Sequence, residues 1–535
     1  MCARSVVMAV VSSLCWISPA GHVRPAAAGP PSPAIGRAAP SVLVNLAVDA
    51  ATTATSAAPD HPAQLATDGD AATAWCPSTM PASLTVDLGR AEAIAGFGIN
   101  LAGAVARGSV ELAVATARGF EPVGPALTLT TGTPTWIARG DRGPAAVRLV
   151  RITVRGEPSQ PSQVLCLGEL RALGTPRSSP AAIGHDLSFA IQEAAIGNRF
   201  TDRGRTALPE RILAEHGANF VRLRLWLDPP GGYSNLASVL AMAQRARAAG
   251  MQILLDFHYS DFWADPQTQN TPAAWQGQDL ATLAQTVRTY TRDVLTALAA
   301  QGTPAAMVQI GNEIRNGMLW PTGWADAWSG DGWANLGALL RAGVAGAHDA
   351  PCPRPRIVIH FDQGGDNAFS RVFFDRVVEQ AVPFDVIGLS YYPFWHGTIT
   401  QLRGNLADLA ARYDKDVMIV ETQYGWTLQN GDSLGNFLWQ DSQVIPGYPA
   451  TPDGQLAFTS DLMSALARVP GGHGAGIFYW QPEWIPGVGW TPGAGSPNDN
   501  LTMFDFSGSA LPSVQFIDPL RACRQFAPGQ APCTF

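Results

Sequence analysis

The feature that most constrains the fold is a repeated alternation of two kinds of segment in the C-terminal part of the chain. Apolar runs of strand length are separated by segments of helical length, and each of the first seven runs is followed by such a segment. The eight runs are DLSFAIQ, FVRLRLWL, MQILLDFHY, MVQIGNE, RIVIHFD, FDVIGLSYY, DVMIVET and GIFYWQPE. Eight consecutive βα units predict an α/β fold, a (β/α)8 barrel, over residues 184–535. An open doubly wound sheet is the alternative, but no glycine-rich phosphate loop follows any of the runs.

Residues 42–172 show a different pattern, which is typical of β-strands. Short alternating runs such as SLTVDLG, GFGINL, SVELAVA and AVRLVRITVRG are separated by Gly, Pro and Asp. This pattern predicts an all-β sandwich. Residues 173–183 contain Pro and Ser between the two parts, and we interpret them as a linker that lets the barrel fold independently.

The N-terminus has the three parts of an export signal. A basic start, MCARS, is followed by the apolar stretch VVMAVVSSLCWI and by the small residues PAAAG. We expect a signal peptide at residues 1–28, a Pro/Ala-rich linker at 29–41, and secretion to the extracellular space. A buried N-terminal helix is the alternative. No later apolar run is long enough to cross a bilayer, so we expect no membrane as a partner.

The cysteines agree with an oxidising compartment. Of the seven in the chain, two lie in the expected signal peptide and five remain. We pair Cys76 with Cys166 and Cys523 with Cys533, because each pair lies within one part of the chain, and this leaves Cys352 free. Five thiols also permit other pairings.

Composition and charge narrow the class of ligand. With 46% hydrophobic and 15% charged residues, the chain can build large cores. Its formal net charge of −8 at pH 7 argues against nucleic acid as a partner, because nucleic acid selects basic surfaces. A neutral ligand suits this balance, and we expect the protein to be a monomer.

Two carboxylates stand at the ends of predicted barrel strands, where the chemistry of such a barrel takes place. Glu313 ends the fourth run and Glu421 ends the seventh. A facing pair of this kind can cleave a glycosidic bond, since one group protonates the leaving oxygen and the other attacks the anomeric carbon or activates water. A short gap between them gives retention of configuration, and a wider gap gives inversion. Each glutamate, taken alone, could instead be a structural partner in an ion pair.

Other residues near the strand ends are of types that bind sugars, because tryptophan rings pack on sugar C–H faces and polar side chains bond to hydroxyls. We expect substrate contacts from Arg224, Asp256, His258, Asn312, Tyr391, Trp395, His396 and Trp480. For Arg224 the alternative is support of the nucleophile. For Asp256 and His258 it is a place behind the site, as hydrogen-bond partners of the residues that touch substrate.

Five longer motifs carry a family resemblance: HGANFVRLRLWLDP, GMQILLDFHYSDFWADPQTQNTPAAW, MVQIGNEIRNGMLWP, FDVIGLSYYPFWHGT and MIVETQYGWT. Together they resemble the arabinogalactan endo-β-1,4-galactanases of glycoside hydrolase family 53. The resemblance implies retaining hydrolysis of β-1,4-galactosidic bonds in type I arabinogalactan. It also implies Glu313 as acid/base, Glu421 as nucleophile, and Asn312 as the group that binds the sugar 2-hydroxyl.

The same resemblance implies Arg224 and Tyr391 near the nucleophile and Trp480 beneath the sugar. Within this clan, a β-1,4-mannanase or cellulase is the alternative enzyme. The loops SDFWADP and PFWHGT favour the galactanase. From another class, the alternative is a sugar-binding protein that has lost catalysis, which the intact glutamates disfavour.

No cofactor is expected to be required, and calcium is the one ion that the resemblance suggests. Some bacterial members hold it between the loops after strands seven and eight. The equivalents here, QNGDSLGN and NDNLTMFDF, keep Asp432, Asn436 and Asp499 but place Gln429 and Leu434 at two other positions. Calcium takes six to eight oxygen ligands, so the sequence predicts at best a reduced structural site.

The N-terminal part resembles the discoidin-like (coagulation factor 5/8 type C) sandwiches. The resemblance rests on ATDGDAATAWCPS, SLTVDLG and LCLGELRALG. It implies carbohydrate attachment as the role of this part. We expect Trp75 to pack in the core rather than to contact a ligand.

Overall fold

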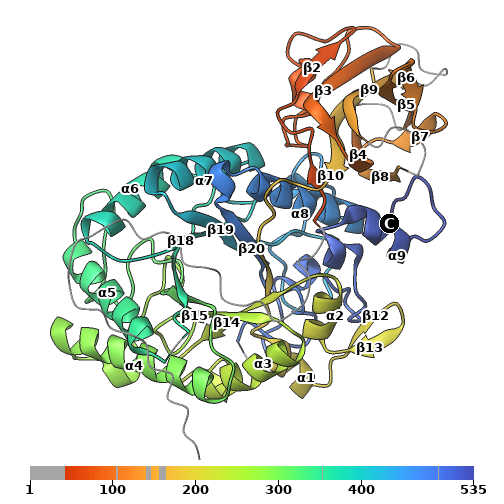
Figure 1. The fold of residues 1–535 in the computed structure, drawn as a ribbon. Helices are drawn as coiled ribbons and strands as arrows, with labels where there is room; N and C mark the ends of the chain where they lie inside the picture. The colour runs from red at the N-terminus through yellow and green to blue at the C-terminus, as the bar shows by residue number, and fades with distance from the viewer. Residues whose placement is uncertain (1–41, 104–106, 140–145, 156–163, 352, 492) are drawn as a thin grey trace, which may run out of the picture.

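The computed structural model describes residues 42–103, 107–139, 146–155, 164–351, 353–491 and 493–535. The expected signal peptide at 1–28, the linker at 29–41 and Cys352 lie outside these residues. The described chain forms a closed barrel of eight parallel strands with an antiparallel sandwich beside it (Figure 1). The predicted fold class is therefore confirmed.

The barrel strands follow one another in chain order around the ring. They are β11 (Ala182–Asp186), β14 (Phe220–Leu225), β15 (Gln252–Phe257), β16 (Met307–Ile310), β17 (Arg356–Phe361), β18 (Val386–Ser390), β19 (Asp416–Glu421) and β20 (Gly474–Tyr479). The helices around them are α1 (Ala190–Ala195), α2 (Pro209–Glu215), α3 (Leu236–Ala248), α4 (Leu280–Ala300), α5 (Trp333–Asp349), α6 (Asn367–Glu379), α7 (Ile399–Tyr413) and α8 (Pro452–Ala467) (Figure 1). A ninth helix, α9 (Pro519–Phe526), lies close to the C-terminus. Two small strands, β12 (Phe200–Asp202) and β13 (Arg205–Ala207), pair outside the barrel.

The first barrel strand differs from the prediction. We expected it in the run DLSFAIQ, but β11 ends at Asp186, the first residue of that run. The remainder leaves the strand and enters helix α1. Its apolar character comes from packing at the barrel mouth, where the rings of Phe189 and Trp484 lie 4.4 Å apart. A short apolar run is compatible with a strand or with another buried segment, so pattern alone could not separate the two.

Alternate residues of each barrel strand face opposite sides, as the pleat requires. On β14, Val221 and Leu223 pack in the large core between strands and helices. Phe220 instead joins the cluster that fills the barrel interior. Arg222 and Arg224 share the parity of Phe220 and therefore point inward. The interior is apolar at the start of the strands and polar at their ends, which builds a polar site at the mouth.

The sandwich consists of two antiparallel sheets. The four-stranded sheet contains β1 (Val44–Asn45), β10 (Cys166–Gly174), β4 (Ile94–Ala102) and β8 (Thr135–Ala138). The other sheet contains β2 (Ala51–Ala54), β3 (Ala82–Glu92), β9 (Val147–Arg155), β5 (Arg107–Thr116) and β6 (Gly119–Pro122), with β7 (Leu127–Thr130) also paired to β5. Between them lies a core that includes Trp75, which is fully buried as expected.

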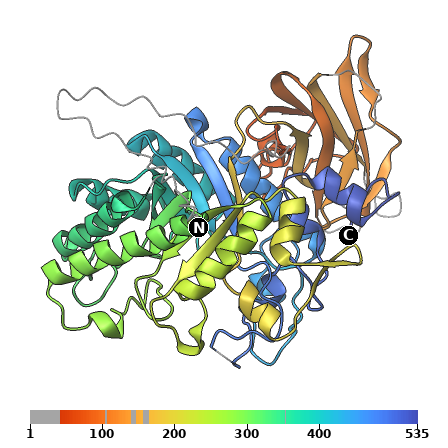
Figure 2. The same ribbon diagram turned by 60° about the horizontal axis from the view of Figure 1, so that its bottom comes forward.

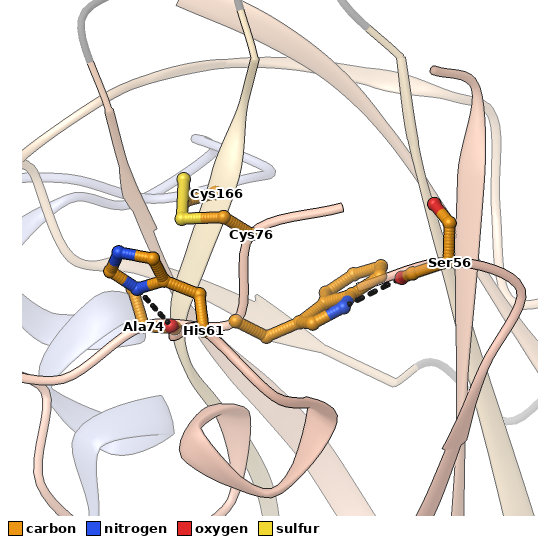
Figure 3. Close-up of a disulfide and its surroundings, with 6 residues drawn as sticks. Ser56, His61, Ala74, Cys76 and Cys166 are labelled. Atoms are coloured by element: carbon orange, nitrogen blue, oxygen red, sulfur yellow. Dashed lines mark hydrogen bonds between the residues drawn. A yellow bond between two sulfur atoms is a disulfide. The ribbon is translucent and has the colours of Figure 1, made fainter. Parts of the chain in front are cut away.

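Both predicted disulfides are present. Cys76 is bonded to Cys166 in the sandwich, and Cys523 is bonded to Cys533 near the C-terminus. Figure 3 shows the first bond beside His61, whose ring nitrogen lies 3.1 Å from the carbonyl oxygen of Ala74. The bond therefore ties the segment around Cys76 to strand β10.

The sandwich and the barrel do not behave as two bodies on a free linker. Leu173 and Gly174 belong to β10, and β11 begins at Ala182, so the expected linker at 173–183 shrinks to residues 175–181. Figures 1 and 2 both place the sandwich directly beside the barrel, next to α8. Val44 and Trp136 of the sandwich belong to the same buried cluster as the barrel core.

The contact between the two parts is polar as well as apolar. Arg171 of β10 donates from Nε and Nη2 to the two carboxylate oxygens of Asp461 on α8, at 2.8 and 2.5 Å, and both side chains are buried. Trp136 of β8 and Cys533 exchange two backbone hydrogen bonds, so the C-terminal segment extends a sandwich strand. The sandwich therefore completes the barrel core and a buried ion pair, which weighs against the expectation of an independently folded barrel.

No helix among the residues listed above as described combines the length and the hydropathy that a membrane span would need.

Candidate active site

Glu313 stands just beyond β16, the fourth barrel strand, on an unusual stretch of backbone. Gly311 has φ of 83° and Glu313 has φ of 46°, both in the left-handed region. A Cβ at Gly311 would lie 2.6 Å from Cγ2 of Ile314, so glycine is required there for space as well as for conformation. The turn ends the strand abruptly and directs Glu313 toward the mouth. For a glutamate, this backbone costs of order 1 kcal/mol or more, which its surroundings must offset.

Glu421 ends β19, the seventh strand, where a β-bulge changes its direction. In the pairing of β18 with β19, Leu389 lies opposite Ile419 and the next residue, Ser390, lies opposite Glu421. One extra residue, Val420, is therefore inserted in β19. Ile419 faces the helices, and simple alternation would send Glu421 the same way. The bulge turns the carboxylate into the barrel instead.

Arg222 is the charge partner of Glu421. Its Nη2 lies 2.8 Å from Oε1 of Glu421 and 2.8 Å from Oδ2 of Asp256, and its Nη1 lies 2.8 Å from Oδ2 of Asp186. The guanidinium is buried. It is held in place by two further carboxylates, so it meets Glu421 with little freedom to move.

We predicted Arg224 near the nucleophile. The structure instead places Arg222, two residues earlier on β14, beside Glu421. Arg224 has the same parity as Arg222 but lies closer to the mouth. Its guanidinium carbon lies 4.8, 4.4 and 4.1 Å from the ring centroids of Phe189, Trp226 and Trp263. Its Nη2 donates to Ser234 at 3.2 Å. Arg224 thus organises the aromatic side chains at the mouth.

The same shift applies to the tyrosines after β18. Tyr392 donates its hydroxyl proton to Oε2 of Glu421 at 3.0 Å. Tyr391, which was expected near the nucleophile, instead donates to the carbonyl oxygen of Gly397 at 2.9 Å and packs on Phe458 in the outer core. Strand parity explains the correction, because Leu389 and Tyr391 share the face that packs against the helices.

Asp256 and His258, expected to contact substrate, are buried behind the carboxylates. Nε2 of His258 lies 3.0 Å from Oδ2 of Asp256. Nδ1 of His258 accepts from the indole N–H of Trp226 at 3.1 Å. Asp256 is fully buried and also accepts from Gln309 at 2.6 Å. These contacts match the alternative considered for Asp256 and His258, in which they are hydrogen-bond partners of the residues that touch substrate.

Asn312 immediately precedes Glu313 in the chain and is nearly buried. Its Oδ1 accepts from Arg222 at 2.8 Å and from Gln309 at 3.1 Å, and its Nδ2 donates to the carbonyl oxygen of Ala264 at 2.8 Å. The amide is therefore fixed in orientation, and one N–H of Nδ2 remains for a substrate hydroxyl.

Glu313 has a hydroxyl as its close partner. Ser390, at the end of β18, donates to Oε1 of Glu313 at 2.7 Å. Ser390 also lies opposite Glu421 in the pairing of β18 with β19, so one serine bonds to Glu313 and neighbours Glu421 in the sheet. His360 lies behind Ser390, with its Nε2 2.8 Å from the serine oxygen.

The two carboxyl groups differ in their readiness to hold a proton. Burial, followed by the charges of Glu421 and Asp362, raises the pKa of Glu313 well above its usual range. Burial also raises the pKa of Glu421, to about 7, but the guanidinium of Arg222 opposes this shift. Glu421 therefore ionises first, and Glu313 keeps its proton. Such a pair supplies an acid and a nucleophile in the same site.

Aromatic side chains surround the mouth. Trp480 follows β20 and is 8% exposed, with its ring 5.7 Å from that of Trp484 and 6.1 Å from that of Trp263. Trp395 is 56% exposed, on the loop after β18. The neighbouring His396 is mostly buried, its Nδ1 accepting from the backbone N–H of Tyr392 at 3.1 Å. Trp395 and His396 line a hollow of about 690 Å³.

The carboxylates considered for calcium already accept hydrogen bonds from the two loops. Both oxygens of Asp432 accept backbone N–H groups, from Leu434 at 2.8 Å and from Ser496 at 2.6 Å. Asp499 accepts from the backbone N–H of Gly431 and from the amide of Asn436, each at 2.9 Å. Over the described residues, no group of three or more His, Cys, Asp or Glu side chains is arranged to hold a metal. Hydrogen bonds join the two loops where a metal was considered.

Sequence reasoning missed Arg222, Tyr392 and Gln309 as parts of this site. The parity of Leu389 along β18 was a usable signal for Tyr392. Parity could not separate Arg222 from Arg224, since both point inward and differ only in depth. Gln309 had no signal, because a buried amide in an apolar run resembles any other polar substitution.

A (β/α)8 barrel with a buried, arginine-paired glutamate on its seventh strand and a proton-holding glutamate on its fourth defines a glycoside hydrolase. Family comparisons agree with this class: residues 182–517 match glycosyl hydrolase family 53, and residues 51–164 match the F5/8 type C domain. This chain belongs to glycosyl hydrolase family 53.

The relatives of this chain include named galactanases and a solved catalytic domain. The arabinogalactan endo-β-1,4-galactanase of Thermothelomyces thermophilus is 36% identical over 339 residues, covering 62% of this chain and 97% of that protein. The same-named enzyme of Cellvibrio japonicus is 36% identical over 365 residues, covering 66% and 94%. The solved Ignisphaera aggregans GH53 catalytic domain has 38% identity and a TM-score of 0.60, covering 63% of this chain and 95% of that chain.

Proposed function

We propose that this protein is a secreted, retaining endo-β-1,4-galactanase that hydrolyses the galactan of type I arabinogalactan. The observation that carries the proposal is the unequal pair of carboxyl groups, Glu313 and Glu421, in a family 53 barrel. The names of the Thermothelomyces thermophilus and Cellvibrio japonicus relatives support the substrate. The two disulfides support secretion, because such bonds persist in oxidising compartments.

In the first step Glu421 attacks the anomeric carbon while Glu313 protonates the glycosidic oxygen that leaves. The C–O bond to the leaving sugar breaks, its electron pair stays on that oxygen, and a covalent galactosyl–enzyme forms. Arg222 and Tyr392 hold the two oxygens of Glu421 before the attack. In the second step the ionised Glu313 takes a proton from water, whose oxygen then attacks the same carbon and releases Glu421.

Retention is supported by the position of Ser390, which links the surroundings of the two glutamates. Ser390 touches Glu313 and lies opposite Glu421 in the sheet. An inverting enzyme needs a wider gap, roughly 6.5–9.5 Å, to hold water between its carboxyl groups.

Replacement of Glu421 provides the test. Glu421→Ala should abolish galactan hydrolysis, because no glycosyl–enzyme can form. Azide, entering the vacated space, should restore turnover of an activated aryl galactoside and give a product of inverted configuration. Failure of rescue, or rescue with retention, would show that Glu421 is not the nucleophile.

The alternative enzymes are a β-1,4-mannanase or cellulase. Rates of reducing-sugar release from galactan, mannan and cellulose should separate them, with galactan hydrolysed at least tenfold faster under this proposal, a difference of about 1.4 kcal/mol in activation free energy.

For the sandwich we propose attachment to carbohydrate, supported by its F5/8 type C match. Binding to insoluble galactan should persist in a Glu421→Ala, Trp480→Ala double variant whose cleft is impaired. Loss of all binding in that variant would mean that the cleft alone holds the polysaccharide.

A further inference from the structure

The acid/base glutamate is held by a buried serine and a buried histidine whose joint role goes beyond packing. Ser390 and His360 are both fully buried. Nε2 of His360 lies 2.8 Å from Oγ of Ser390, and Oγ of Ser390 lies 2.7 Å from Oε1 of Glu313. The chain of contacts returns to its start, because the backbone N–H of Glu313 donates to Nδ1 of His360 at 3.2 Å.

The contacts of His360 assign the direction of the protons in this circuit. Nδ1 faces two donors, the backbone N–H of Glu313 at 3.2 Å and Nε2 of Gln309 at 2.9 Å, and one acceptor, Oδ1 of Asn312 at 3.0 Å. Because a backbone N–H can only donate, and Oδ1 of Asn312 already accepts from Arg222, we assign Nδ1 as an acceptor that carries no proton. Nε2 of His360 then carries the proton and donates it to Ser390. The serine hydroxyl, having accepted from His360, directs its own proton to Glu313. Burial lowers the pKa of His360 well below its usual range, so the ring stays neutral.

We propose that Ser390 and His360 are positioning residues that reserve Oε1 of Glu313 as a hydrogen-bond acceptor and leave Oε2 as the atom that gives and takes the catalytic proton. The inference rests on the proposed role of Glu313 as acid/base. In the first step Oε2 loses its proton to the leaving oxygen, and the new carboxylate is received at Oε1 by the hydroxyl of Ser390. In the second step Oε2 takes the proton of water. Ser390 keeps its own proton throughout.

The surrounding charges make this hydroxyl important. Glu421, Asp362 and Asp265 all favour the protonated form of Glu313, and burial does the same. Arg315 lies 3.3 Å from Asp362 and partly neutralises it. Among the residues that the structure describes, Ser390 provides the hydrogen bond that the carboxyl group of Glu313 receives. It therefore opposes the other influences and keeps the carboxylate form accessible for the second step.

Ser390→Ala tests the inference through the pH dependence of kcat/KM on galactan. Loss of a hydrogen bond to the charged form raises the pKa of Glu313 further, so the alkaline limb of the profile should move upward by about half to one pH unit. Ser390→Thr keeps the hydroxyl and should restore the original limb. Ser460→Ala is the matched control, because Ser460 is buried on α8 and its hydroxyl has no hydrogen-bond partner among the described residues.

A folded Ser390→Ala enzyme whose alkaline limb stays in place, or moves to lower pH, would overturn the inference. If Ser390→Ala does not fold, Ser390→Cys has nearly the same shape and a weaker donor, and it should move the limb in the same direction by less. Glu313→Gln separates this test from the proposed function. If Glu313→Gln still hydrolyses galactan at the wild-type rate, the role of Glu313 is wrong. If it is inactive and the Ser390 limb does not move, only the inference about Ser390 and His360 fails.

Discussion

At the scale of single residues, the site depends on choices between near neighbours of the same type. Arg222 bonds to Glu421 while Arg224 stacks among aromatic rings. Tyr392 donates to Glu421 while Tyr391 packs in the outer core. In each pair the chemistry follows from depth in the barrel or from the side of the strand, and not from residue type.

The tyrosine pair gives a matched prediction. Tyr392→Phe removes a donor from the ionised form of Glu421, so the pKa of Glu421 should rise above its value of about 7. Under the proposed mechanism Glu421 must be ionised to attack, so activity should be lost as pH falls through this pKa. The acid limb of kcat/KM should therefore move to higher pH in the variant. The rate at neutral pH should fall roughly ten- to a hundredfold.

Tyr391→Phe is the control, and it should leave the acid limb in place because its hydroxyl bonds to a backbone carbonyl in the outer core. Equal shifts in the two variants would mean that the tyrosines act through general packing.

At the scale of elements, α8 is a helix that is buried on all sides. Every residue from Asp453 to Leu466 is buried, because the barrel covers one face and the sandwich covers the other. Such a helix lacks the polar stripe of a surface helix. Its sequence, PDGQLAFTSDLMSALA, already contains few charges, and this was an unused sign that something covers the outer face of the barrel.

Asp461 on α8 should be among the most sensitive residues for stability. Asp461→Ala leaves Arg171 buried without its partner, which should lower the free energy of unfolding by about 3–5 kcal/mol. Denaturant unfolding would measure the change. Asp375→Ala is the matched control, because Asp375 pairs with Arg412 on an exposed surface and should change stability little. Similar losses in both variants would contradict the importance given to the buried pair.

The sequence predicted the fold well because the barrel repeats one simple pattern, and it located Glu313 and Glu421 at strand ends because those ends are marked by a change from apolar to polar residues. Glu421 shows the limit. Plain alternation from Ile419 would point Glu421 toward the helices, but a β-bulge turns it inward. Nothing in the run DVMIVET indicates that bulge. The position of Arg222 beside Glu421 likewise depends on the stagger between strands, which the linear sequence does not encode visibly.

At the scale of the whole molecule, the sandwich and the barrel share a core. Removal of all residues before Ala182 would expose the outer face of α8 and leave Asp461 without Arg171. The truncated barrel should therefore unfold at a lower temperature than the full chain, or aggregate, and thermal unfolding would show it. A truncated barrel as stable as the full chain would mean that the shared core contributes nothing.

A cut in the connecting segment gives the complementary experiment. A protease site placed within residues 175–181 should yield two pieces that still elute together and remain active, because the interface holds them without the peptide bond. Separation of the pieces after cleavage would show that the link itself kept them together.

The tight packing of the sandwich against α8 has a consequence for activity on insoluble polysaccharide. A module on a slack tether lets a catalytic domain swing and sample every strand within its radius. Here the sandwich, in its proposed role as an attachment module, and the cleft stay at one fixed separation. While the sandwich stays bound, the enzyme could cut only those polysaccharide chains that lie at that fixed distance from the binding point. Further cutting would require the sandwich to dissociate and bind at another place. Turnover on solid material would be governed by residence time, whereas turnover on dissolved chains would not.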